Sequence, residues 1–212
     1  MAWTVAATLM VLPGSAHAQT PVGPKLDTSA TVGWFASDRD VREGPYFEDD
    51  TQHRWVFGGD IGWYWTEHLK SEIGVSATTT GSSFVLVPIV TPTPREYPFA
   101  SGQRRGRETR IVAQQIYQFG RNAWVHPYVG AGVAVLWETA RIDFDRPPFA
   151  YPEPPVPLPD HAESATRVKP VLSAGLKAYI SPRAFFRSDI LVSPWSSSRD
   201  VTVRAGIGVD LK

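Results

Sequence analysis

The sequence contains no cysteine, which excludes disulfide bonds, thiolate metal sites and cysteine nucleophiles. It also has no net charge, because 21 basic residues balance 21 acidic ones, so composition gives no indication of a nucleic-acid partner. Beyond the N-terminus, no stretch approaches the roughly 18 consecutive apolar residues of a transmembrane helix. Glycine (17), proline (19) and tryptophan (8) are abundant, a composition typical of an all-β barrel or sandwich.

The N-terminus has the pattern of a secretory signal peptide. Residues 3–12 are apolar, and Pro13-Gly14 and the small-residue site Ala16-His17-Ala18 follow. No lysine or arginine precedes Lys25, so the usual positive segment is lacking. We expect a signal peptide over residues 1–18; the alternative is a short buried apolar segment. An exported chain without a helical anchor is either a soluble periplasmic protein or an outer-membrane barrel.

Residues 125–138 carry the clearest alternating pattern. One face is apolar throughout and ends in Trp137, whereas the other is mostly small or polar and includes Gly130, Gly132 and Glu138. A period of two predicts a strand. About 10 residues of tilted strand cross a bilayer, and an uncharged face backed by glycines indicates lipid outside and a crowded barrel interior.

The same alternation recurs along residues 19–212, which we treat as one domain. It predicts eight strands, over residues 28–37, 53–65, 69–80, 108–119, 125–143, 166–180, 184–193 and 201–211. Two strands are irregular. Phe35 falls on the polar face of the first, and Val112 and Ile116 lie opposite our preferred outer face in the fourth.

The connections alternate in length. Those at residues 66–68, 120–124 and 181–183 are short, whereas residues 38–52, 81–106 and 145–163 are charged or proline-rich and read as long loops, with a possible hairpin extension near residues 84–87. These features predict an all-β fold, an eight-stranded antiparallel up-and-down transmembrane barrel with short periplasmic turns and long Pro-rich extracellular loops. A soluble lipocalin-like binding barrel would have its apolar face inside.

Tryptophans gather near the ends of the expected outer face. Trp55, Trp63 and Trp65 share one face of a single strand. Together with Trp34 and Trp137 they predict an aromatic girdle at the membrane interfaces, the alternative being one face of a sandwich core.

Charged residues recur on the opposite, inward face. An eight-stranded barrel is filled by its side chains, so charges there must be paired. The expected network comprises Asp60, Lys70, Glu72, Lys169, Lys177, Arg187, Asp189, Arg204 and Asp210, with Arg110 and Glu138 as additions. It would plug the barrel; the alternative is a narrow polar path, or a pocket at the barrel mouth formed by Tyr46, Phe47, Phe99 and Tyr151.

Residues for catalysis or cofactor binding are not evident. His53, His68, His126 and His161 are widely separated and have no serine at short spacing, so a catalytic triad is weakly indicated. His161 with Asp160 and Glu163 fits a solvated loop better than a metal site. No phosphate loop, dinucleotide fingerprint or nucleic-acid module appears, and we expect no cofactor. The basic cluster at residues 104–107 fits a solvated loop base that could contact anionic lipopolysaccharide.

The segment around His126-Pro-Tyr-Val-Gly-Ala-Gly-Val133 resembles the OmpA/OmpW-type outer-membrane β-barrel family, and Arg204-Ala-Gly-Ile-Gly-Val-Asp-Leu211 is similar to that family's last strand. The resemblance implies an outer-membrane location of the Gram-negative type, with lipid, lipopolysaccharide and the barrel-assembly machinery as partners. It implies a monomeric, non-enzymatic protein with a structural or surface-interaction role. A narrow channel for small or apolar solutes and a lipid-modifying enzyme are the alternatives. Such barrels usually end in an aromatic residue, whereas this chain ends in Leu211-Lys212.

Overall fold

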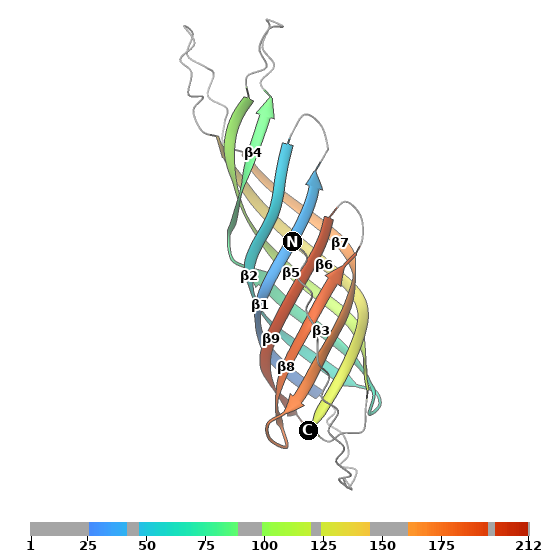
Figure 1. Cartoon of the computed structure of the whole chain (residues 1–212). Coiled ribbons are helices and arrows are strands. Elements are labelled where there is room, and N and C mark those ends of the chain that lie inside the picture. Colours follow the sequence, from blue (N-terminus) through green and yellow to red (C-terminus); the bar gives the residue numbers. More distant parts are fainter. Residues whose placement is uncertain are drawn as a thin grey trace, which may run out of the picture.

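The computed structural model describes residues 26–41, 47–88, 99–119, 124–144, 161–194 and 198–211. They form a barrel whose strands are tilted relative to its axis (Figure 1). The expected signal peptide, residues 1–18, lies outside these residues. The strands are β1 (Leu26–Val41), β2 (Phe47–Tyr64), β3 (Leu69–Thr78), β4 (Gly81–Pro88), β5 (Phe99–Gln118), β6 (Val125–Phe144), β7 (His161–Tyr179), β8 (Ala184–Ser193) and β9 (Ser198–Leu211).

Every pairing between neighbouring strands is antiparallel, and the sheet closes because β1 pairs with both β2 and β9. The nine segments make an eight-stranded barrel, since β3 and β4 occupy successive parts of one position between β2 and β5. The predicted fold class is therefore confirmed.

A one-residue bulge separates β3 from β4. Ala77 pairs with Thr109 and Gly81 with Gly106, so four steps along one strand oppose three along the other. At the bulge, the Thr78 hydroxyl accepts a hydrogen bond from the backbone amide of Glu108 (2.9 Å). Thr79 keeps its bond to the Trp55 carbonyl (2.9 Å), so the barrel stays closed through the bulge.

Hydroxyl side chains stabilise two tight turns at the same end of the barrel. Thr66 Oγ1 accepts a hydrogen bond from the Leu69 amide (3.0 Å), and Ser181 Oγ accepts one from the Ala184 amide (2.9 Å). These contacts supply polar partners for backbone groups that the turns remove from the ladder. The predicted turns at residues 66–68 and 181–183 are present, whereas most of the third, at residues 120–124, lies outside the described residues. Strand β8 has the bounds that the sequence predicted.

The predicted loops were too long. The possible hairpin extension near residues 84–87 is present and is longer than expected, since residues 81–88 pair with residues 99–106 of the expected loop. Strands β1, β2, β7 and β9 also extend further than predicted. These segments were assigned to loops because they contain charged residues and proline. Strands that continue beyond a bilayer meet water and can be charged, and Pro88 occupies a strand end, where a missing amide donor is tolerated.

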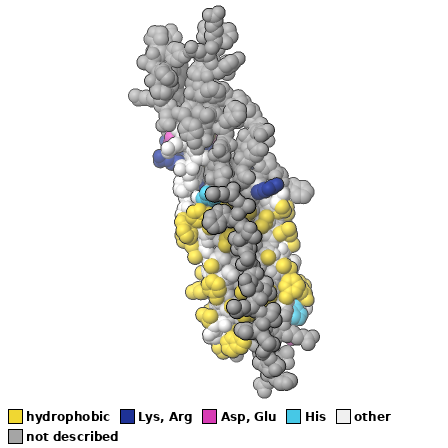
Figure 2. Space-filling view, viewed as in Figure 1, with side chains coloured by type: hydrophobic (Ala, Val, Ile, Leu, Met, Phe, Trp, Pro, Cys, Tyr) yellow, Lys and Arg dark blue, Asp and Glu magenta, His cyan; other side chains and the backbone are white. Residues whose placement is uncertain are grey.

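Alternation decides which side chains face outward. Along β5, Val112 and Ile116 are buried while Ala113 and Tyr117 are exposed, as the sequence predicted, and Phe35 is buried. Figure 2 shows the result on one face, where exposed hydrophobic side chains gather over one part of the barrel's length.

Candidate functional site

The barrel interior holds all nine charged residues that the sequence assigned to it, each at most 9% exposed. Arg110 and Glu138 are buried there as well. Isolated buried ions cost several kcal/mol each, so partners are required. The structure places these residues in three groups along the barrel axis.

The middle group centres on Arg187 of β8. Its guanidinium binds both carboxylate oxygens of Glu72 on β3, at 2.7 and 2.8 Å, and its Nε donates to Asp189 at 2.7 Å. Tyr128 of β6 accepts a bond from the same Nε and donates one to Asp189 (2.8 Å each). Bidentate arginine–carboxylate pairs of this kind are among the strongest polar contacts in proteins.

Arg204 extends the middle group to β2. It binds both carboxylate oxygens of Asp189, at 2.8 and 3.1 Å, and donates to Asp60 at 3.2 Å. Gln114 of β5 donates to Glu72 on β3 (2.9 Å) and accepts from Ser173 on β7 (2.8 Å), so the network also reaches β7 across β6.

The second group lies at the end that carries the tight turns. Lys70 binds Asp27 and Glu72, each at 2.9 Å, which connects this group to the middle one. Lys177 binds Asp27 at 3.0 Å and Asp210 at 2.8 Å. Lys177 also donates to Tyr64 (2.9 Å) and lies 3.8 Å from the centre of the Phe185 ring.

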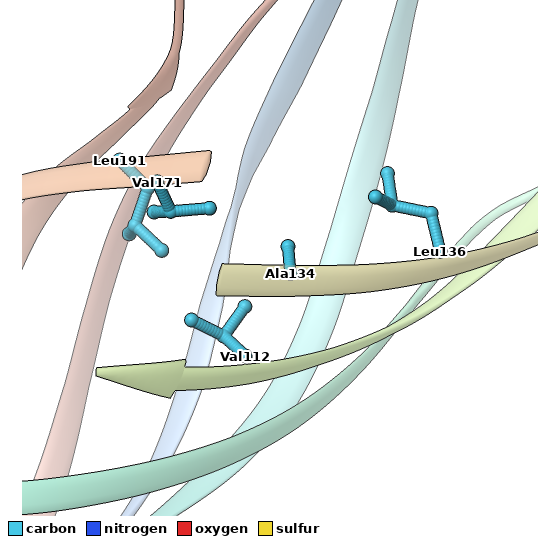
Figure 3. Close-up of a cluster of buried hydrophobic side chains, with 5 residues drawn as sticks. All are labelled: Val112, Ala134, Leu136, Val171 and Leu191. Atoms are coloured by element: carbon cyan, nitrogen blue, oxygen red, sulfur yellow. The ribbon is translucent and has the colours of Figure 1, made fainter. Parts of the chain in front are cut away.

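A layer of buried apolar side chains interrupts the polar interior. Val112, Ala134, Leu136, Val171 and Leu191 form this layer and project from four strands into the interior (Figure 3). Their exposed fractions are 5% or less. This cluster lies beside the third group of charges, because Leu136 pairs with Arg110 and Ala134 pairs with Lys169.

The third group lies toward the opposite end. It consists of the pairs Arg110–Glu108 (2.7 Å), Arg104–Glu138 (3.0 Å) and Lys169–Asp200 (2.5 Å). Of the nine predicted interior charges, Lys169 lies in this group, as do the predicted additions Arg110 and Glu138.

Sequence reasoning missed several members of the network, namely Asp27, Arg104, Glu108 and Asp200. All four lie at or beyond the ends of strands that were predicted too short. Each has the inward parity of its strand, so extending the alternation past the expected ends would have found them.

The five tryptophans predicted for a girdle are all exposed on the outer surface. Trp34 packs edge-on against Trp55 (5.3 Å between ring centres), and these two lie nearer the third group. Trp63 and Trp65 lie at the end with the tight turns, where Trp65 Nε1 donates to Ser71 (2.7 Å). Trp124 is also exposed at that end and was not predicted.

The three histidines whose side chains are described, His53, His68 and His126, have separate surroundings. His68 contacts the Gln118 carbonyl (3.0 Å), His53 stacks on Trp34, and His126 packs against Tyr179. The side chains of Asp160 and His161, like those of the expected mouth pocket (Tyr46, Phe47, Phe99 and Tyr151), lie outside the described ones. Among the described residues no group of histidine and carboxylate side chains could hold a metal ion. No helix in the described part of the chain is long and apolar enough to cross a membrane.

A closed antiparallel barrel with an apolar outer band and a charged interior defines the class of outer-membrane β-barrels. Residues 4–210 match the model of the outer membrane protein beta-barrel domain family, and the chain belongs to that family. No curated protein sequence matches the chain significantly.

Solved structures with this fold include three small outer-membrane proteins. Neisserial surface protein A has a TM-score of 0.53 and 13% identity, over 88% of this chain and 97% of its own. The attachment invasion locus protein Ail of Yersinia pestis, in complex with the heparin analogue sucrose octasulfate, has a TM-score of 0.50 and 12% identity, over 87% and 98%. OprG of Pseudomonas aeruginosa has a TM-score of 0.50 and 11% identity, over 88% and 96%. At such low identities the structural similarity shows a shared fold alone.

Proposed function

We propose that this protein is a small outer-membrane barrel with a structural or surface-interaction role, whose interior is closed to solutes. The interior charges carry the proposal, because they bind one another across the barrel rather than lining a path. The buried side chains of Val112, Ala134, Leu136, Val171 and Leu191 fill a further part of the same interior.

The outer surface supports a lipid-embedded position. The outward positions from Trp55 to Trp63 are Phe57, Gly59 and Ile61, none of them charged. About 27 Å of strand separates the two tryptophans. At a tilt of about 40° this covers roughly 20 Å of the membrane normal, close to the roughly 25 Å band of such barrels.

In the proposed orientation the tight turns face the periplasm and residues 42–46, 89–98 and 145–160 connect strands outside the cell. Trp34, Trp55 and Trp137 form the outer girdle, and Trp63 and Trp65 the inner one. Residues 1–18 act as the signal peptide. The partners are lipid, lipopolysaccharide and the barrel-assembly machinery, and the barrel is a monomer.

Two measurements test the proposal. The chain is expressed with residues 1–18, and isolated outer membranes are run unboiled and boiled on a gel. We expect a heat-dependent mobility shift in the membrane fraction. A soluble periplasmic product without a shift would contradict the membrane location. The refolded barrel is then placed in planar bilayers, with a porin as positive control, and we expect no conductance steps. Reproducible steps would instead support a narrow channel.

The proposal assigns no catalytic residue. Mass spectrometry of lipid A from expressing cells should show the same species as cells with an empty vector. A new lipid A mass would favour the lipid-modifying alternative.

A further inference from the structure

A basic groove of about 520 Å³ lies on the outer surface where β5, β6 and β7 run side by side. Arg105 and Arg107 of β5 and Arg141 of β6 line it, together with Thr139 of β6 and its partner on β7, Ser164. It is formed by the parts of β5 and β7 that the sequence had assigned to loops.

The three arginines are neighbours because of strand register. Arg105 lies directly opposite Arg141, and Arg107 lies opposite Thr139, diagonal to Arg141. Directly opposed residues have Cβ atoms about 5 Å apart, and like charges in such a pair destabilise the sheet. Three guanidinium groups on one outward face are therefore expected to have an anion between them.

Carboxylates of the chain itself neutralise only part of the positive charge of the three arginines. Arg141 binds Asp143 at 3.0 Å, and Glu163 on the groove wall is 3.9 Å from Arg104 Nε, which points inward. Arg105 donates to Gln103 (3.3 Å). Among the described residues, neither Arg105 nor Arg107 has a carboxylate within ion-pair distance.

The height of the groove relative to the apolar band indicates the source of the anion. Thr139 lies two residues beyond Trp137 on β6, and Arg141 lies four beyond it. These steps are about 7 and 13 Å along the strand, or roughly 5 and 10 Å along the membrane normal at a tilt of about 40°. Interfacial tryptophan marks the headgroup level, so the arginines lie among or just above the headgroups. On the face seen in Figure 2, basic side chains lie at one edge of the hydrophobic band.

We propose that Arg105, Arg107 and Arg141 bind the phosphate groups of an outer-leaflet lipid headgroup. Guanidinium groups bind phosphate through two parallel hydrogen bonds, and the small Thr139 and Ser164 side chains leave room for a sugar phosphate beside the arginines. The inference rests on the proposed orientation, which places this end of the barrel in the outer leaflet.

The test measures binding of the refolded full chain, in detergent, to mixed micelles containing diphosphoryl lipid A. The R105Q/R107Q variant is compared with R183Q/R199Q, which removes the same charge from two exposed arginines away from the groove. Each charge-assisted contact contributes about tenfold or more to affinity, so we expect R105Q/R107Q to bind at least about tenfold more weakly. The R183Q/R199Q variant should stay within about twofold of the parent.

Four results would overturn the site: equal losses in both variants, no loss in R105Q/R107Q, equal binding of dephosphorylated lipid A, or displacement of lipid A by millimolar inorganic phosphate. The last would assign the groove to free phosphate. Both variants must keep the heat-dependent mobility shift. A barrel that shifts and does not conduct but fails to bind lipid A contradicts this inference alone, whereas loss of the shift in the parent contradicts the proposed function.

Discussion

Arg187 and Glu72 lie 115 residues apart in sequence and form a two-bonded ion pair inside the barrel. The guanidinium and the carboxylate are 4% and 1% exposed. The pair connects β8 to β3, which are not neighbours in the sheet, so it holds opposite walls of the barrel together.

Replacing Glu72 by glutamine should lower the free energy of unfolding in lipid by about 3–5 kcal/mol. The change leaves the Arg187 and Lys70 cations without their shared carboxylate, and breaking a buried pair leaves an uncompensated charge. Guanidinium unfolding followed by the gel mobility shift measures the loss. E67Q, at an exposed turn residue, is the control and should change stability by less than about 0.5 kcal/mol. Equal stability of E72Q and the parent would show that the pair contributes nothing.

Inward glycines make room for the charged side chains, which predicts a contrast between two alanine substitutions. A Cβ at Gly74 would overlap the Asp60 carboxylate, whereas a Cβ at Gly59 would meet only the Ser29 carbonyl at 3.3 Å. Overpacking costs about 1–3 kcal/mol, so Gly74→Ala should destabilise the refolded barrel by that amount while Gly59→Ala changes little. The same unfolding assay compares them, and a larger loss in Gly59→Ala would contradict the packing.

The inward or outward direction of the strand residues could be predicted from the sequence, even in the irregular strand β5. There Val112 and Ile116 are inside although they are apolar. The sequence was not sufficient for strand length, because the strand ends opposite the tight turns lie beyond the apolar band and lose the alternation that reveals them. Arg104 and Asp200 were missed for that reason, whereas Asp27 lies one residue before the predicted start of its strand.

The partners of the interior charges could not be predicted either. Glu72 and Arg187 meet because of the closure and tilt of the whole barrel. The alternation along each strand shows which residues face the interior, but it does not show which of them pair. The groove of Arg105, Arg107 and Arg141 depends on register in the same way, since Arg105 lies opposite Arg141 only for one alignment of β5 and β6.

Val133 tests the lipid-facing surface directly. It is 48% exposed in the middle of β6, and arginine at the bilayer midplane of such a barrel costs about 2–4 kcal/mol. Val133→Arg should therefore fold into lipid vesicles with that loss of stability, measured by unfolding from the vesicles. Gln115→Arg is a useful comparison, because Gln115 is already a polar outward residue and donates to Ser71. If Val133→Arg were as stable in vesicles as the parent, Val133 would not face lipid.

The absence of cysteine permits a direct test of orientation in cells. Ser82, at the start of β4, and Glu67, in the turn between β2 and β3, are both exposed and lie at opposite ends of the barrel. In the proposed orientation a membrane-impermeant maleimide labels Ser82→Cys in intact cells and labels Glu67→Cys only after the outer membrane is made permeable. The parent chain is the control for background labelling, since it has no thiol. The reverse pattern would place the tight turns outside the cell. It would also move the arginine groove to the periplasmic leaflet, where the proposed lipid A headgroup is absent. Labelling of both variants in intact cells, with a heat-dependent shift retained, would mean that the two ends are equally accessible and that the barrel does not separate two compartments.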